Sequence, residues 1–298
     1  MNRIMTLALA LVLALGCIFT ALAEETDMAG IMAEYDLTAE DIEYVANIFK
    51  QLNEGNDPHL ESKGGYYDIE LKLAKLGAAM GNGELAKWVG EIYQGGNVEG
   101  VDEAEAVEIA IEWWQKAAEL GVPNGLTDIG LLYAHSGVPG GGKLFGNIEE
   151  DPAKAMEYYL AGFEAGDSKA ARYIAMAYDS GNGVEQNYEE AAKYFSIATE
   201  LNDTTAFWYL GDYYFNGTGV EQDYAKAAEL YAVCAGAAKA TPPGVKQSRY
   251  QLGVMYEQGL GVEQNLDTAI EYYKGSAEAE YEPALEALAR LGVEVKAE

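Results

Sequence analysis

The chain has 298 residues, of which 49% are hydrophobic, and it carries 49 acidic residues against 19 basic ones. A chain of this length and apolar content can bury a sizeable core, which excludes general disorder. Its formal net charge of -30 disfavours nucleic acid and anionic membrane surfaces as primary partners, because both repel an acidic protein. The acidic residues are spread along the chain, so we interpret them as a solvated surface; recruitment of a basic partner is the alternative.

The first 23 residues have the features of an export signal. Arg3 precedes an apolar stretch over 7–19, and Ala-Leu-Ala at 21–23 forms a small-x-small cleavage motif. We therefore expect the protein to act outside the cytoplasm, either secreted or in the cell envelope, with no integral membrane segment after cleavage.

Two alternatives to simple cleavage stay open. The string "ALGC" at 14–17 is similar to a lipoprotein box, which would place a lipid anchor on Cys17. The uncleaved segment could also act as a membrane anchor. Cleavage would leave one cysteine, Cys234, so no intramolecular disulfide is expected, and we interpret Cys234 as a small apolar core residue.

The second half of the chain repeats itself. In three segments a tyrosine lies thirteen residues before an alanine, with the string G-x-G-V-E-Q between them. The first two segments are 36 residues apart and the third follows after 42, because "TPPG" at 241–244 lengthens one connection. This period is typical of a helical solenoid. The segments are "YDSGNGVEQNYEEA" from Tyr178, "YFNGTGVEQDYAKA" from Tyr214 and "YEQGLGVEQNLDTA" from Tyr256.

Each unit is expected to contain two helices. Alignment on the tyrosine recovers two more units, around Tyr93 and Tyr133. An aliphatic and a small residue before each tyrosine predict a first helix that its partner approaches closely. Aromatic residues three and four positions after the alanine are interpreted as core. The small residues are Gly90, Gly130, Ala175, Gly211 and Gly253, and the second helices are expected to begin near Ala110, Ala155, Ala191, Ala227 and Ala269.

Glycines mark the turn between the two helices. They stand in pairs at 181/183, 217/219 and 259/261. Glycine tolerates the positive φ that ends one helix and starts the next turn, so we interpret these pairs as turns. The string "SGVPGGGKL" at 136–144 matches P-loop spacing, but it follows a predicted helix and has Leu144 where a magnesium-binding hydroxyl is needed. It is interpreted as an enlarged loop between helices.

The shared pattern, YxxGxGVEQ(N/D)YxxAxxYY with Leu-Gly-x-x-Tyr before it, resembles the Sel-1-like repeat family, a branch of the tetratricopeptide superfamily. Residues 168–281 match it closely, and 84–167 match with insertions. The resemblance implies an all-α, right-handed superhelical solenoid of antiparallel helix pairs that serves as an adaptor scaffold. The expected organisation is a signal peptide at 1–23, a flexible mature N-terminus at 24–37, degenerate N-terminal helices at 38–83, five repeats at 84–281, and a capping helix and tail at 282–298.

No catalytic or metal-binding set emerges from the sequence. The two histidines, His59 and His135, lie in unrelated loop contexts, which excludes a metal site built from histidine or cysteine pairs. The acidic segment 179–190 lacks the glycine that a calcium loop requires at its turn. We therefore expect no enzyme activity, no cofactor and no metal.

By analogy with tetratricopeptide solenoids, the first helices would line a concave groove. Positions three before and one after the small residue lie four apart, on one helical face. Trp208 and Tyr250 could instead pack against neighbouring helices. The predicted groove residues are Lys87, Glu91, Thr127, Leu131, Arg172, Met176, Trp208, Asp212, Tyr250 and Val254.

The sequence thus supports two hypotheses of function. The leading one is a non-catalytic scaffold, secreted or in the cell envelope, that binds a protein or peptide partner in this groove, since aromatic residues, methionine and arginine are enriched in binding hot spots. The alternative is a protein that binds or hydrolyses a cell-wall glycan or peptidoglycan fragment.

Overall fold

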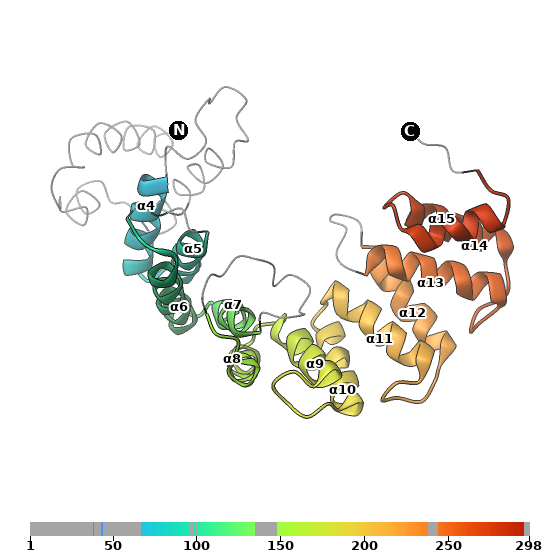
Figure 1. Ribbon diagram of the computed structural model, residues 1–298, viewed down its shortest axis with the longest axis horizontal. Coiled ribbons are helices and arrows are strands. Elements are labelled where there is room, and N and C mark those ends of the chain that lie inside the picture. The colour runs from blue at the N-terminus through green and yellow to red at the C-terminus, as the bar shows by residue number, and fades with distance from the viewer. Residues whose placement is uncertain are drawn as a thin grey trace, which may run out of the picture. The chain divides into compact units, whose positions relative to one another are not determined.

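The structure is a computed structural model whose regular secondary structure is entirely helical over the described residues (Figure 1). The predicted helix at 38–53 lies almost wholly outside the described residues. The loop at 136–144, the signal segment and both histidines lie entirely outside them. The described residues are 67–95, 98, 100–134, 148–237 and 244–294, together with residues 38 and 43.

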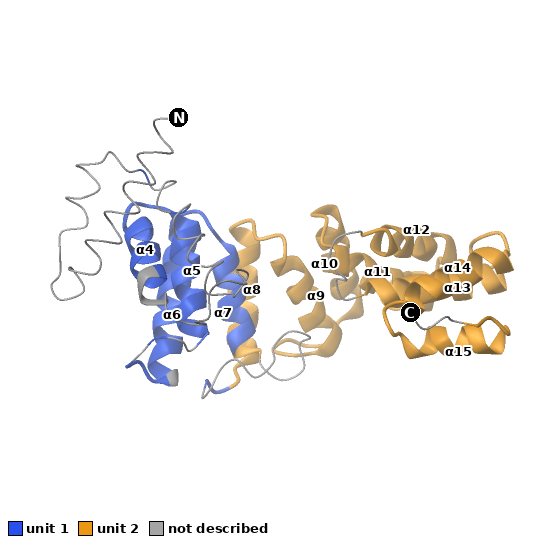
Figure 2. Cartoon of the chain, turned by 90° about the horizontal axis from the view of Figure 1, so that it is seen from above, with its two compact units in different colours: residues 1–132, 139–149 blue, residues 133–138, 150–298 orange. Residues whose placement is uncertain are grey.

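The chain divides into two compact units (Figure 2). Unit 1 comprises residues 1–132 and 139–149, and unit 2 comprises residues 133–138 and 150–298. Among the described helices, none combines the length and the apolar character that crossing a membrane requires.

Unit 1 contains α4, α5, α6 and nearly all of α7. Helix α5 packs against both α4 and α6. Its approach to α6 is close at Gly90, where an added Cβ would lie 2.5 Å from the Trp114 ring. Gly125 allows α7 to approach α6 closely as well, since a Cβ on Gly125 would lie 2.8 Å from the Trp114 carbonyl oxygen. The helices are α4 (Tyr67–Ala79), α5 (Gly83–Gln94), α6 (Glu103–Glu119) and α7 (Asn124–Tyr133).

Helix α6 begins seven residues before Ala110, where the alignment of repeats placed the start. Asp102 is its N-cap, and the Asp102 carboxylate accepts a hydrogen bond from the backbone N–H of Glu105 at 2.9 Å. An aspartate in this position supplies an acceptor to the first turn and stabilises the helix start there. The prediction was wrong at this point because the cap, not the repeat register, decides where the helix begins.

Unit 2 contains eight helices among its described residues, and each packs against the next in the chain. We call α9, α11 and α13 first helices, and α10, α12 and α14 second helices. Each of these second helices begins three residues before its predicted alanine, at an Asn or Asp N-cap: Asn187, Asp223 or Asn265. The helices are α8 (Pro152–Glu164), α9 (Ala170–Ser180), α10 (Tyr188–Glu200), α11 (Thr204–Asn216), α12 (Tyr224–Ala235), α13 (Val245–Gln258), α14 (Leu266–Ala277) and α15 (Glu282–Arg290).

The glycine pairs have the predicted positive φ, and each member has its own role. The first glycine of the pair caps the first helix in the left-handed conformation, as Gly217 does at φ 70°. The second lies against the backbone of the preceding second helix. A Cβ on Gly219 would lie 2.2 Å from the carbonyl oxygen of Tyr188, the first residue of α10. The second glycine therefore joins neighbouring repeats, a role that the sequence analysis did not assign.

The two aromatic columns of the second helices occupy different environments. The residue four positions after the alanine is buried in every repeat: Trp114, Tyr159, Phe195, Tyr231 and Tyr273 are at most 3% exposed. The residue before it is less completely buried in most repeats. In three of them it is a tyrosine that stacks on the tyrosine used to align the repeats. Tyr178 and Tyr194, for example, stack with ring centroids 5.9 Å apart. The interpretation of the aromatic stripe as core is confirmed for the residues four positions after the alanine.

Helix α15 is held to α13 by a charged contact. Both terminal nitrogens of Arg290 donate to the Glu257 carboxylate at 2.7 Å, and the Tyr273 hydroxyl donates to the same group at 2.7 Å. These donors lower the pKa of Glu257, since all of them favour its ionised form. Leu288 and Ala284 of α15 are fully buried against the α14 core.

Candidate partner-binding face

The predicted groove positions of unit 2 lie on three first helices at equivalent places. All six side chains are partly exposed, between buried and fully open. We call this set the first-helix face. It consists of Arg172 and Met176 on α9, Trp208 and Asp212 on α11, and Tyr250 and Val254 on α13.

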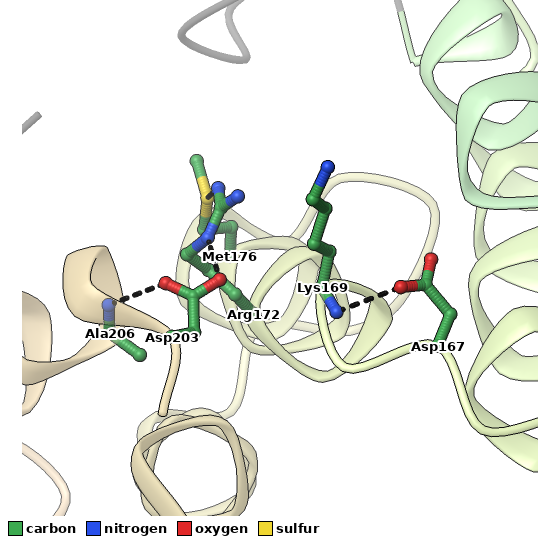
Figure 3. A network of polar contacts seen from close by, with 6 residues as sticks. All are labelled: Asp167, Lys169, Arg172, Met176, Asp203 and Ala206. Atoms are coloured by element: carbon green, nitrogen blue, oxygen red, sulfur yellow. Dashed lines mark hydrogen bonds and ion pairs between the residues drawn. The ribbon is translucent and has the colours of Figure 1, made fainter. Parts of the chain in front are cut away.

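Arg172 is fixed by the N-terminus of the next first helix (Figure 3). Its Nε donates to Asp203 Oδ2 at 2.8 Å, while Asp203 Oδ1 accepts from the backbone N–H of Ala206 at 3.0 Å. The guanidinium also lies 4.3 Å from the centre of the Tyr173 ring. The Arg172 charge is therefore neutralised within unit 2, and the side chain holds α9 and α11 in register.

Trp208 and Tyr250 are partly packed, which was the alternative left open by the sequence. A Cβ on Gly244, just before α13, would lie 2.7 Å from Trp208 Cβ, so the backbone there rests on the Trp208 side chain. The Tyr250 ring lies 5.7 Å from the Tyr273 ring and 5.6 Å from the Tyr281 ring. Both residues contribute to packing between helices and also keep part of their surface exposed.

Asp212 is a largely buried carboxylate with a neutral partner. The Tyr231 hydroxyl donates to Asp212 Oδ1, and within the described part of the chain no cationic side chain lies within ion-pair distance of it. Burial raises the pKa of Asp212 from 3.8 to about 6, and the Tyr231 hydrogen bond only partly opposes that shift. Burial and the nearby carboxylate likewise raise the pKa of Tyr231.

We expect Asp212→Asn to stabilise the protein at neutral pH. The folded pKa is raised, so the stability that Asp212 contributes is present below its unfolded pKa and is lost as the pH rises through about 6. Asparagine stays neutral and still accepts from Tyr231, so the gain should be about 1–2 kcal/mol at pH 7.5 and smaller at pH 5. Urea denaturation at both pH values measures it; a destabilised variant at pH 7.5 would contradict this account. Glu229→Gln, an exposed change on α12, should have no effect.

Of the four predicted groove residues of unit 1, three are polar and one is buried. Lys87 bonds to Glu91 one turn later and pairs with Asp128 of α7 at 3.4 Å. Burial alone would lower the pKa of Lys87, but Asp128 and Glu91 outweigh it and the pKa is raised. Thr127 is 1% exposed, so its side chain is not available to a partner, whereas Leu131 is partly exposed.

Several residues that shape these surfaces were missed in the sequence. Asp203 and Asp128 are the partners of Arg172 and Lys87, and each lies in a neighbouring repeat. Asp203 had a usable signal, because an aspartate before Thr204 is a typical N-cap. Tyr231 and Tyr281 had none, since the sequence does not show which phenol reaches across to another helix.

Cys234 is fully buried as a free thiol, which confirms its interpretation as a small core residue. Burial raises the pKa of this thiol, as expected for a thiol of low reactivity. Over the residues that the structure describes, no group of three His, Cys, Asp or Glu side chains is placed to hold a metal ion.

Helix pairs stacked in order, with glycine, alanine and aromatic columns at fixed offsets, define an α-helical solenoid protein. The Sel1 repeat model matches five segments, which together cover more than half of the chain. The chain belongs to the Sel1 repeat family, as its sequence pattern predicts. No curated protein sequence matches it. The matched segments are 86–122, 140–167, 168–203, 206–232 and 246–281.

Two of the solved structures to which the chain is similar illustrate this fold. One is c5321, a protective antigen present in uropathogenic Escherichia coli strains and displaying an SLR fold; it is 29% identical, with a TM-score of 0.62, over 76% of this chain and 45% of that one. The other is a Sel1 repeat protein from Oxalobacter formigenes, 23% identical, with a TM-score of 0.63, over 83% of this chain and 89% of that one. The chain thus spans less than half the length of the antigen. Both likenesses agree with the all-α solenoid fold class.

Proposed function

We propose that the protein is a non-catalytic scaffold that binds a segment of a partner protein on the first-helix face of unit 2. Sel1 repeat proteins are typically scaffolds for protein interaction. The observation that carries the proposal is the composition of this face: arginine, methionine, tryptophan and tyrosine stand at equivalent positions of three successive first helices, and all keep part of their surface exposed. Tryptophan, tyrosine and arginine are enriched among binding hot spots, and methionine is enriched in interfaces.

We further propose that the protein works outside the cytoplasm. The support is the sequence of the first 23 residues, with a basic start, an apolar stretch and a small-x-small motif. A scaffold in this location would meet secreted or envelope proteins, which defines the extracts in which a partner should be sought.

The test is capture of a partner with the full chain as bait. Alanine at Trp208 or Tyr250 would also disturb packing, so we choose Met176→Lys with Val254→Lys, two substitutions on partly exposed residues. Wild type should retain a partner from envelope or culture-fluid extracts, and the double variant should retain at least tenfold less, because two charges enter an apolar contact.

The matched control is Val233→Lys, which places the same charge on a 53% exposed residue of the second helix α12. It should capture as wild type does. Circular dichroism establishes that all variants are folded. Equal capture by the double variant would remove the first-helix face from the proposal. A protein that retains no polypeptide but binds a soluble glycan would favour the alternative function.

A further inference from the structure

We infer that Asp212 and the aromatic side chains near it recognise a lysine or arginine side chain of the bound partner segment. This inference rests on the proposed function and names the chemistry of its partner. It would make the first-helix face selective for basic segments.

The first argument is the uncompensated charge of Asp212. The face carries two charged residues, and only one of them has an opposite charge beside it: Arg172 pairs with Asp203, whereas Asp212 receives a hydrogen bond from the neutral Tyr231. A largely buried carboxylate without a counter-charge is unfavourable, and a cation placed against it removes that cost. The free oxygen of Asp212 is available for such a group, because the described residues give only Oδ1 a partner.

The second argument is that the repeat fold does not require an acid here. The equivalent positions of the neighbouring repeats hold Met176 and Val254, both apolar, in helices of the same type. The middle repeat therefore carries a carboxylate where its neighbours carry apolar side chains, and we expect that carboxylate to lower the stability at neutral pH. Residues that cost stability without serving the fold are typical of functional sites.

The third argument is the aromatic environment. Trp208 lies one turn before Asp212 on α11, and Tyr250 occupies the equivalent position on the adjacent helix α13. Tyr281 is close enough for the Asp212 charge to contribute to the raised pKa of its phenol, after burial and Tyr250. Aromatic faces attract ammonium and guanidinium groups. A carboxylate on a face that also carries aromatic rings therefore matches lysine or arginine better than an apolar or acidic side chain.

The charge of the whole chain agrees with this partner. With a net charge of -30 the protein attracts basic segments over a distance and repels acidic or phosphorylated ones. A single carboxylate is a poor metal site, and the described residues bring no further metal ligands together around it. We therefore assign the site to a cationic side chain and not to a free ion.

Protonation should compete with the cation. The titratable groups that act on Asp212 or feel its charge are Tyr209 on its own helix, Tyr231 on α12 and Tyr281 before α15, and all three phenol pKa values are raised. None of these phenols titrates between pH 5 and 8. Arg172 and Asp179 of α9 act on Tyr209, and Arg172, whose pKa is raised, keeps its charge over the same range. A loss of binding on acidification through about pH 6 would thus report on Asp212.

The experiment uses the full chain and a bead library of random decapeptides. Wild type at pH 7.5 should select peptides enriched in lysine or arginine. For selected peptides, Asp212→Asn should weaken binding at least tenfold, while Glu229→Gln, which removes the same charge at an exposed position of α12, should leave it unchanged. Binding to wild type should fall from pH 7.5 to pH 5, and binding to Asp212→Asn should not.

Each other outcome overturns a defined part of the account. Selected peptides without basic residues, or equal affinity for Asp212→Asn, would overturn the cation site and leave the proposed function standing. An equal loss in Glu229→Gln would show attraction by overall charge only and also overturn it. If no peptide binds, both the inference and the proposed function fail. If amine-bearing muropeptides bind through Asp212 and peptides do not, the partner is not a protein segment and the assignment is overturned.

Discussion

Gly219→Ala is expected to destabilise unit 2 by about 3–5 kcal/mol, an effect that combines two costs. Gly219 has φ 65°, a conformation that a Cβ makes unfavourable. Its Cβ would also lie 2.2 Å from the Tyr188 carbonyl oxygen, which belongs to the backbone of the preceding repeat and cannot rotate away. The two repeats would have to separate, and the melting temperature should fall by about 10 °C.

Gly217→Ala is the matched control for this prediction. Gly217 has nearly the same φ, 70°, but its Cβ would meet only Gln222 of its own turn, and the nearest atom, the Gln222 Cβ, would lie 3.2 Å away. The expected loss is about 1–2 kcal/mol, from backbone strain alone. Thermal unfolding followed by circular dichroism compares the two variants. Equal losses would show that the second glycine serves its own turn and not the contact between repeats.

Phe195→Ala is expected to cost about 3–5 kcal/mol because it empties the centre of a repeat. Phe195 is 0% exposed. Its ring stacks on Tyr209 with centroids 4.9 Å apart and meets the edge of Tyr213 at 5.4 Å. Alanine would remove both contacts and leave a cavity between α10 and α11, which two rigid helices cannot close completely.

Substitution of the neighbouring residue, Tyr194→Ala, tests whether the second aromatic column contributes less to stability than the buried column. Tyr194 is partly exposed and stacks on Tyr178 at the repeat surface, so its removal leaves space that water can enter. We expect a loss of about 1–2 kcal/mol, measured by urea denaturation under the same conditions. A loss as large as that of Phe195→Ala would contradict the assignment of the two aromatic columns to different environments.

Much of the fold could be predicted because single residues at fixed positions in each repeat determine it. A positive φ at Gly217 and a buried ring at Phe195 are local requirements, and each leaves a sequence signal. The contact between Gly219 and Tyr188 left no such signal, because it depends on how one repeat packs on the previous one. The early start of α6 was missed because repeat spacing does not reveal a cap at Asp102.

The sequence predicted which residues share the first-helix face, but not which of their charges have an opposite charge beside them. Helical spacing placed Arg172 and Asp212 on one face, yet it could not show that one is neutralised by Asp203 and the other is not. That difference arises from side chains that reach between repeats and from the degree of burial, neither of which a single sequence shows. It is also the difference on which the proposed selectivity depends.

The most direct test of the central claim is hydroxyl-radical footprinting of the full chain with and without its captured partner. Met176, Trp208 and Tyr250 are reactive, partly exposed side chains of the first-helix face, while the reference, Tyr188, is 42% exposed and belongs to the second helix α10. We predict that the partner reduces oxidation of the first three and leaves Tyr188 unchanged. Unchanged oxidation of the first-helix face, with protection confined to Tyr188 or to unit 1, would contradict the proposed binding mode.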